Sequence, residues 1–269
     1  MGYGRRMSKW IGALGESVLS RLGAAARLAG TLFAVVWKGL QPRTWTPPFR
    51  NVLARQVLFT GYEATGFVSL IALMFGLLAV VEADIWLNKL GQAALIGPVL
   101  VTVILRELGP LLTNFAVIAR SGTAISTELA NMKVNGEVRA LDAMGLDPFT
   151  YLVMPRVLGV AASTFCLTVV FSAVSLLGGF VCLWAMEWGE PDMGRFFGNI
   201  IGSIGPTDVW TLVAKSILPG MLTGACCCEE GLSVGPSASE VPIAAARGVI
   251  RSIAALFVSS VLISVAAYF

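Results

Sequence analysis

Five long apolar stretches separate the polar parts of this chain, and they restrict it to one kind of fold. The stretches cover residues 57–81, 93–118, 157–186, 209–228 and 253–269. A helix needs about 20 apolar residues to cross the ~30 Å hydrocarbon core of a bilayer. Within that core every backbone N–H and C=O must be paired inside the protein, and a helix does this within its own segment. The sequence therefore predicts an all-α integral membrane protein with five transmembrane helices.

Composition excludes a sizeable soluble domain and several kinds of active site. Hydrophobic residues make up 56% of the chain and charged residues 13%, whereas soluble domains carry about 25% charged residues. The chain contains no histidine, which removes the commonest general base and metal ligand. It also lacks a Walker A loop and the G-x-S-x-G and H-E-x-x-H patterns. We therefore expect no enzyme activity, no cofactor and no metal site.

The five cysteines point to helix packing rather than to chemistry. They are Cys166, Cys182, Cys226, Cys227 and Cys228, and all lie in apolar stretches without the spacing of a zinc site. A disulfide framework is not expected in such a chain. The run at 226–228 leaves acylation at a membrane edge or redox activity as an alternative, but we interpret these cysteines as small apolar helix residues.

The N-terminal residues 1–55 are basic and amphipathic. They hold nine of the nineteen Lys and Arg residues and a single acid, Glu16. Apolar residues recur at steps of three and four from Trp10 to Val36, which is typical of a helix that lies in the membrane interface. We expect residues 1–55 to form an N-terminal interfacial amphipathic helix and a linker, and residues 56–269 to form the five-span domain. Packing of this helix on the protein's own spans is the alternative.

A polar segment, residues 119–156, separates the second span from the third. It carries a polar stripe at steps of three and four, formed by Glu128, Asn131, Asn135, Arg139 and Asp142. An apolar stripe runs beside it, formed by Thr127, Ala130, Val134, Val138 and Leu141. Two such stripes predict an amphipathic helix over residues 128–145, which Gly136 can bend. Asp147-Pro148 then predicts a turn before the third span.

The distribution of Lys and Arg predicts the orientation of the spans. Residues 1–55 carry nine and residues 119–156 carry four, whereas the loops at 82–91 and 187–208 carry one each. Loops rich in Lys and Arg stay on the cytoplasmic side of a membrane. We therefore expect the N-terminus in the cytoplasm and the C-terminus outside.

Two charged residues, Arg106 and Glu107, lie near the middle of the second span. A single charge there costs about 2.5–3.5 kcal/mol, and such residues usually face a bundle interior or a wet cavity on a substrate path. Neighbouring helical residues point about 100° apart, so these two side chains cannot readily pair with each other. Each needs its own partner: an anionic headgroup is a candidate for Arg106, and an internal structural pair is the alternative. Lys215 in the fourth span is a weaker candidate because a lysine can snorkel.

Proline and glycine mark positions where the spans bend or approach one another. We expect Pro98 and Gly109-Pro110 to kink the second span. The kink after Arg106 opens one face of the helix, which suits a cavity for a lipid. Gly220 and Gly224 in the fourth span form a pattern of small residues that allows close helix packing.

Residues 107–159 resemble the signature of the MlaE-type permeases, the membrane subunits of ABC systems that work with MCE proteins to move lipids between membranes. The resemblance extends to the N-terminal helix and the five spans. The matching positions are Glu107-Leu108-Gly109-Pro110, Arg120, Gly122, Glu128-Leu129, Met132-Lys133-Val134, Ala140-Leu141, Met144-Gly145, Asp147-Pro148, Tyr151-Leu152-Val153 and Pro155-Arg156. The last span departs from the family pattern, because Ser259-Ser260 stand where the family often carries an acid.

The resemblance implies a set of partners and a location. It implies a homodimer, two cytoplasmic ABC ATPase subunits that hydrolyse the ATP, an MCE-domain protein on the outer side and a phospholipid cargo. It places the chain in a bacterial inner membrane, and no nucleic acid partner is expected. On this reading the polar stripe of residues 128–142 belongs to a coupling helix that contacts the ATPase. We assign the lipid contacts to Arg106, Glu107, Leu108 and Pro110.

Three other readings are weighed against a phospholipid permease. An ABC permease for another hydrophobic solute, such as a sterol or terpenoid, shares every feature except the cargo. A membrane scaffold without transport would make Arg106 and Glu107 purely structural. A membrane enzyme lacks a catalytic constellation in this sequence.

Overall fold

The computed structural model describes residues 23, 26–92, 95–186 and 193–268. Much of the N-terminal helix prediction falls on residues 1–22 and 24–25, outside the described residues. The chain divides into two compact units, Met1–Trp45 and Thr46–Phe269. Each unit is described by itself.

The described part of the first unit is a helix over residues 26–39 followed by a 3-10 turn, Pro42–Thr44. The rings of Phe33 and Trp37, one helical turn apart, are stacked with their centroids separated by 6.1 Å. Both side chains are exposed in the structure. An exposed aromatic face of this kind is what an interfacial helix presents to the membrane.

The second unit is entirely helical in its described residues. A short 3-10 turn, Tyr62–Ala64, joins the first two helices. In chain order the α-helices are α2 Pro47–Thr60, α3 Thr65–Lys89, α4 Ile96–Leu100, α5 Gly109–Val117, α6 Thr123–Val134, α7 Glu137–Ala143, α8 Met154–Met186, α9 Met193–Ser203, α10 Pro206–Leu232 and α11 Val241–Tyr268.

Among the residues that the structure describes, five helical stretches are long and apolar enough to cross a membrane, which confirms the predicted number of spans. They are Pro47–Leu87, Ile96–Val134, Phe149–Cys182, Pro206–Leu232 and Ala238–Ala267. Each extends beyond the expected apolar stretch at one end or both, because a helix continues into the polar residues that flank an apolar stretch until a breaking residue ends it.

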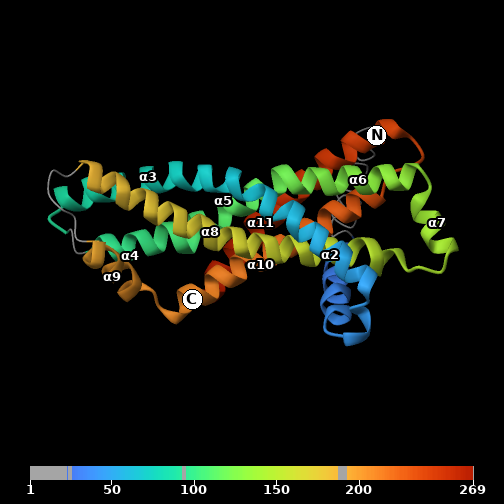
Figure 1. Ribbon diagram of the computed structural model, residues 1–269, viewed down its shortest axis with the longest axis horizontal. Helices are drawn as coiled ribbons and strands as arrows, with labels where there is room; N and C mark the ends of the chain where they lie inside the picture. The colour runs from blue at the N-terminus through green and yellow to red at the C-terminus, as the bar shows by residue number, and fades with distance from the viewer. Residues whose placement is uncertain (1–22, 24–25, 93–94, 187–192, 269) are drawn as a thin grey trace, which may run out of the picture. The chain divides into compact units, whose positions relative to one another are not determined.

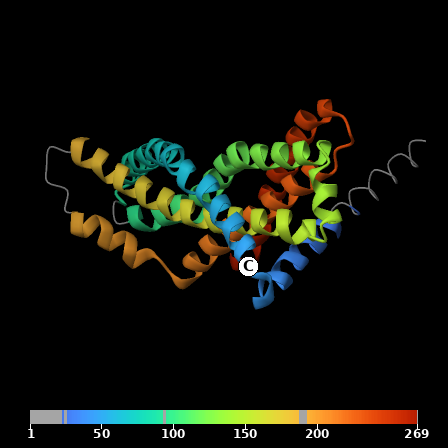
Figure 2. The ribbon, with the colours of Figure 1, turned by 45° about the vertical axis from the view of Figure 1, so that its right-hand side comes forward.

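The fourth span, α10, is the centre of the second unit. It packs against α8, α6 and α11, and 61% of its most apolar window is buried, compared with 17% for the fifth span. In Figures 1 and 2, α4 and α9 lie together at one end of this unit and α7 lies at the opposite end. The low burial of α11 leaves an apolar face that the single chain does not cover.

Small residues allow the spans to approach closely, as predicted for α10. A Cβ atom at Gly224 would lie 2.8 Å from the Cα of Val157, and one at Gly220 would lie 3.2 Å from the Cα of Ala161. Real Cβ atoms do not come that close to backbone without displacing it, so these glycines set the spacing between α10 and α8. The predicted close-packing pattern is therefore confirmed.

The second span contains two π-helical segments. The chain is π-helical over Val101–Leu108 and again over Ile118–Gly122, with α5 between the two segments. The first π segment ends immediately before Gly109-Pro110 and contains Arg106 and Glu107. Irregular turns of this type often occur at functional sites, because they redirect side chains out of the regular 3.6-residue repeat.

The polar segment 119–156 differs from the prediction of one amphipathic helix. Its first part continues the second span without a break as far as Val134, because no glycine or proline ends the helix earlier. Gly136 then adopts φ +78°, a left-handed conformation that an α-helix cannot contain, and separates α6 from α7. The expected helix over residues 128–145 is therefore two helices joined by a sharp turn.

The predicted turn at Asp147-Pro148 is present. The carboxylate of Asp147 accepts hydrogen bonds from the backbone N–H of Phe149 at 3.1 Å and from the Thr150 hydroxyl at 2.6 Å. A π-helical turn, Phe149–Val153, follows and leads into α8. The third span thus begins before its apolar stretch does, and the Asp147 side chain satisfies one of its first backbone donors, the N–H of Phe149.

Candidate functional site

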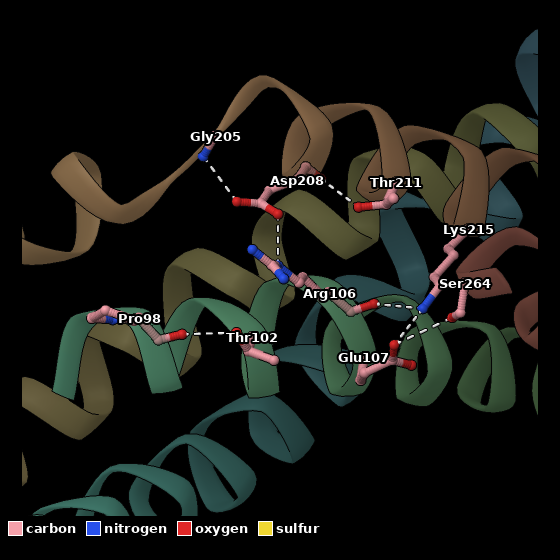
Figure 3. A network of polar contacts seen from close by, with 9 residues as sticks. All are labelled: Pro98, Thr102, Arg106, Glu107, Gly205, Asp208, Thr211, Lys215 and Ser264. Carbon is pink, nitrogen blue, oxygen red and sulfur yellow. Dashed lines mark hydrogen bonds and ion pairs between the residues drawn. The ribbon is translucent and has the colours of Figure 1, made fainter. Parts of the chain in front are cut away.

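The charges of the second span are paired with residues of the fourth. Arg106 Nε lies 2.6 Å from Asp208 Oδ1, and Glu107 Oε1 lies 2.6 Å from Lys215 Nζ. Figure 3 shows both pairs between the π-helical segment and α10. The expectation that Arg106 and Glu107 need separate partners is confirmed. For Arg106, however, the structure supplies an aspartate where the sequence suggested a headgroup.

Asp208 is held in place by the start of α10. Its Oδ2 accepts a hydrogen bond from the backbone N–H of Gly205 at 2.8 Å, which forms part of a capping box, and its other oxygen faces Arg106. The side chain is only 2% exposed. Pro206 and Asp208, at the first and third positions of the helix, are the signal that could have identified it. Asp208 falls in the loop expected at residues 187–208, so it was not predicted as a partner.

Lys215 does not snorkel to the membrane surface as the sequence suggested. Its side chain is 1% exposed and points into the bundle, where Nζ donates to Glu107 Oε1 at 2.6 Å and to the Arg106 carbonyl at 3.1 Å. Glu107 is 48% exposed and also accepts a 3.4 Å hydrogen bond from Ser264 of α11. The pair therefore joins three spans, with the lysine buried and the carboxylate at the surface of the single chain.

The contact between the Lys215 amine and the Arg106 carbonyl follows from a proline. In an α-helix the Arg106 carbonyl would accept the backbone N–H four residues later, but that residue is Pro110, which has none. A symmetrical arrangement exists on α10, where Pro219 cannot serve the Lys215 carbonyl. Asn114 Nδ2 donates to that carbonyl at 3.3 Å, and also to the Pro110 carbonyl at 2.8 Å.

The second and fourth spans thus each satisfy a backbone carbonyl of the other. Each contains a proline, and each supplies the side chain that bonds the carbonyl released by the other's proline. A buried carbonyl without a partner costs about 1–3 kcal/mol. This reciprocal arrangement fixes the crossing of the two helices at the level of the charged pairs.

The remaining predicted lipid contacts lie on the same helical turns. Leu108 is partly buried and Pro110 is buried, so that neither is fully open on the single chain. Arg106 lies ten residues from Ile96, or about 15 Å of helix, which places it well inside a ~30 Å hydrocarbon core. Among the described residues there is no group of three His, Cys, Asp or Glu side chains that could hold a metal ion.

The second predicted site, the polar stripe, lies at the opposite end from α9. All five of its residues are exposed, and those of the adjacent apolar stripe are partly or fully buried. Glu128 forms an ion pair with Arg156 at 3.2 Å. The stripe is divided by Gly136, so that Arg139 and Asp142 lie on α7 and Glu128 and Asn131 on α6.

No disulfide joins the five cysteines, all of which lie in the described residues. Cys226, Cys227 and Cys228 are buried within α10. Cys227 lies 3.5 Å from the Ser252 hydroxyl of α11. These side chains pack between helices and contribute no charge to the site.

Two comparisons bear on what this arrangement does. A sequence model of the family described as "Permease MlaE" matches residues 53–266. The match includes the paired charges of the second and fourth spans and the whole of the segment 119–156.

Individual proteins match along most of their length. A probable ABC transporter permease protein of Rickettsia conorii is 26% identical over 233 residues, covering 86% of this chain and 87% of its own. A probable ABC transporter permease protein of Synechocystis is 28% identical over 244 residues, covering 91% and 89%. The intermembrane phospholipid transport system permease protein MlaE of Haemophilus influenzae is 26% identical over 195 residues, covering 72% of each chain.

Proposed function

The chain belongs to the MlaE permease family, and on that premise we propose that it moves phospholipid, or a related lipid, between membranes. It is a permease subunit of an ABC transporter and not itself the ATPase. The Haemophilus influenzae relative bears the name of an intermembrane phospholipid transport permease. The chemistry of the paired charges supports the same cargo class for this chain.

The observation that carries the proposal is the presence of partly exposed charges deep in the membrane. The side chains of Arg106 and Glu107 are 28% and 48% exposed on the single chain. Charges at that depth usually face a bundle interior or a wet cavity on a substrate path. A second copy packed against this surface would enclose both charges, which supports a homodimer with a shared central cavity.

We assign the lipid contacts to Arg106, Glu107, Leu108 and Pro110. A guanidinium binds carboxylate and phosphate with the same paired hydrogen-bond geometry, so a phosphate headgroup can compete with Asp208 for Arg106. Exchange of one anion for another keeps Arg106 paired at each step, while Asp208 keeps its hydrogen bond from the Gly205 N–H. Glu107 and Lys215 then remain to hold the second and fourth spans together while the headgroup passes.

The ATPase subunits dock on the polar stripe in this proposal. The exposed residues of α6 and α7 form an elongated polar surface beside the turn at Gly136, and a short helix such as α7 suits a cleft in a partner. In the orientation predicted from the Lys and Arg distribution, the chain lies in a bacterial inner membrane with this end on the cytoplasmic side. The N-terminus is then inside and the C-terminus outside. The MCE-domain protein then binds at the end that contains α9.

ATP-driven lipid transfer by the purified chain, reconstituted with its ATPase, tests the proposal. The variant Arg139→Glu with Asp142→Lys reverses two exposed charges on α7 and leaves the Glu128–Arg156 pair intact. We expect about tenfold less co-purified ATPase and a matching loss of transfer, because like charges would face each other in the docked complex.

The control reverses two exposed charges at the other end, Glu82→Lys with Lys89→Glu, and should leave ATPase binding unchanged. Absence of lipid transfer by the wild-type complex would reject the transport function. Equal ATPase recovery from the α7 variant and the control would reject the docking surface alone.

A further inference from the structure

Two adjoining cavities form a groove along α2, at the end of the second unit that contains α6. One has a volume of about 580 Å³ and the other of about 300 Å³. Both are lined by Val52, Arg55, Glu128 and Arg156. We call this the α2 groove. Glu128 is the one lining residue that also belongs to the sites proposed above.

The groove presents two cations and one anion. Arg55 is exposed and forms no ion pair within the described part of the chain, whereas Arg156 is paired with Glu128 at 3.2 Å. Two positive charges and one negative charge leave a net charge of +1. An anionic group is therefore the ligand that these side chains favour.

One donor atom of Arg156 is buried without a partner among the described residues. Its side chain is 8% exposed; Nη2 faces Glu128, and Nη1 donates to the Tyr151 carbonyl at 3.4 Å, which Pro155 cannot serve. Its buried Nε has no hydrogen-bond partner among the described residues. A buried guanidinium donor without a partner is costly, and an oxygen of a bound anion would satisfy it.

The rest of the lining is largely apolar. Val52 and Leu152 face the larger cavity and Phe59 the smaller one. Free phosphate needs no such walls, but the glycerol and first methylenes of a phospholipid do. The combination of one charged end and apolar walls is the pattern of a headgroup site.

The lengths of the helices place the groove at the headgroup level. The first span contains 41 residues, and α3 alone, with 25 residues or about 37 Å, exceeds the ~30 Å hydrocarbon core. The part of α2 that precedes the apolar stretch beginning at residue 57 therefore extends beyond the core. The second span likewise continues to Val134. The groove between these extensions faces the region where lipid phosphates lie.

We propose that the α2 groove binds the phosphate of an anionic phospholipid from the adjoining leaflet, through Arg55 and the Nε of Arg156. The site is separate from Arg106 and gives the permease, whose proposed function this inference rests on, a second lipid contact at the membrane surface. A phospholipid fits better than the ATPase as occupant, because the groove is positively charged, has largely apolar walls and lies beside α2, while the residues of the polar stripe other than Glu128 line neither cavity.

Lipid retention by the purified full chain tests the assignment without ATP or a partner. The chain is extracted from nanodiscs of mixed phosphatidylglycerol and phosphatidylcholine, and retained lipid is counted by native mass spectrometry. Arg55→Gln removes one charged donor, and Val52→Trp fills the groove. We expect Arg55→Gln to lower phosphatidylglycerol retention about tenfold, the effect of one charge-assisted hydrogen bond. We expect Val52→Trp to lower it as well, because the larger side chain occupies the space of the lipid. Arg50→Gln is the matched control, since Arg50 is exposed on α2 but lines neither cavity.

Three results would overturn the proposal. Equal retention by Arg55→Gln and Arg50→Gln would show that Arg55 does not contact the phosphate. Displacement of the lipid by equimolar inorganic phosphate would make the groove a free-phosphate site. Normal lipid retention by Val52→Trp, together with a loss of co-purified ATPase when the same variant is prepared with its ATPase, would make the groove a protein docking surface. The transfer assay of the wild-type complex decides the proposed function independently, because this experiment measures binding only.

Discussion

At the scale of single residues, the partner of Arg106 changes what its removal should do. A charge without a protein partner could be deleted at little cost. Arg106 is instead paired with Asp208, whose carboxylate is 2% exposed and would be left buried and uncompensated. Breaking a buried ion pair by removing one member is usually destabilising. Stability and lipid binding must therefore be separated before Arg106 can be assigned to the headgroup.

A pair of variants makes that separation. We expect Arg106→Gln to lower the free energy of unfolding by about 3 kcal/mol. Adding Asp208→Asn should restore most of it, because asparagine can still accept the hydrogen bond from the Gly205 N–H. If Arg106 contacts the headgroup, the double variant regains its melting temperature but still retains little phospholipid. Recovery of both properties in the same detergent would show that Arg106 serves only as an internal structural pair.

At the scale of elements, the crossing of the second and fourth spans depends on one backbone hydrogen bond that each helix lacks because of a proline. Pro110 and Pro219 each release a carbonyl that a side chain of the other helix bonds. Within its own helix each proline only removes a hydrogen bond, and the replacement donor comes from the other helix. The arrangement also sets the height at which Lys215 meets Glu107, since the same amine bonds both the carbonyl and the carboxylate.

Restoring the missing backbone donor should rescue the loss of its substitute. Asn114→Leu leaves the Lys215 carbonyl without its side-chain donor, and we expect it to lower the free energy of unfolding by about 1–3 kcal/mol. Pro219→Ala supplies a backbone N–H to that carbonyl, so the double variant should melt higher than Asn114→Leu. Pro219→Ala alone is the control. An equal melting temperature for Asn114→Leu with and without Pro219→Ala would show that this carbonyl does not need Asn114.

At the scale of the whole molecule, the five spans and the charge asymmetry predict where each end lies. Leu90 and Ala143 are exposed and lie at opposite ends of the second unit, beyond α3 and at the end of α7. In a chain with all five cysteines replaced, Leu90→Cys should react with a membrane-impermeant maleimide only from outside. Ala143→Cys should react only after the cytoplasmic side is opened. Labelling of Leu90→Cys from the cytoplasmic side alone would reverse the predicted orientation.

The sequence by itself determined the features that depend on local pattern. The number of spans follows from apolar length, the turn at Asp147 from residue chemistry, and the close packing of α10 from Gly220 and Gly224. The separate partners of Arg106 and Glu107 follow from helical geometry alone. Each of these depends on residues near one another in the chain, where the spacing along a helix determines which side chains share a face.

Only the tertiary structure decided which distant residues meet. The partners of Arg106 and Glu107 lie on α10, about a hundred residues away, and no periodicity within one helix indicates a contact of that separation. Lys215 is buried because the Glu107 carboxylate and the Arg106 carbonyl of another helix accept its hydrogen bonds. Its neighbours in the sequence do not indicate this. The groove beside α2 arises in the same way, since Arg55 and Arg156 become neighbours only when two helices extend past the membrane side by side.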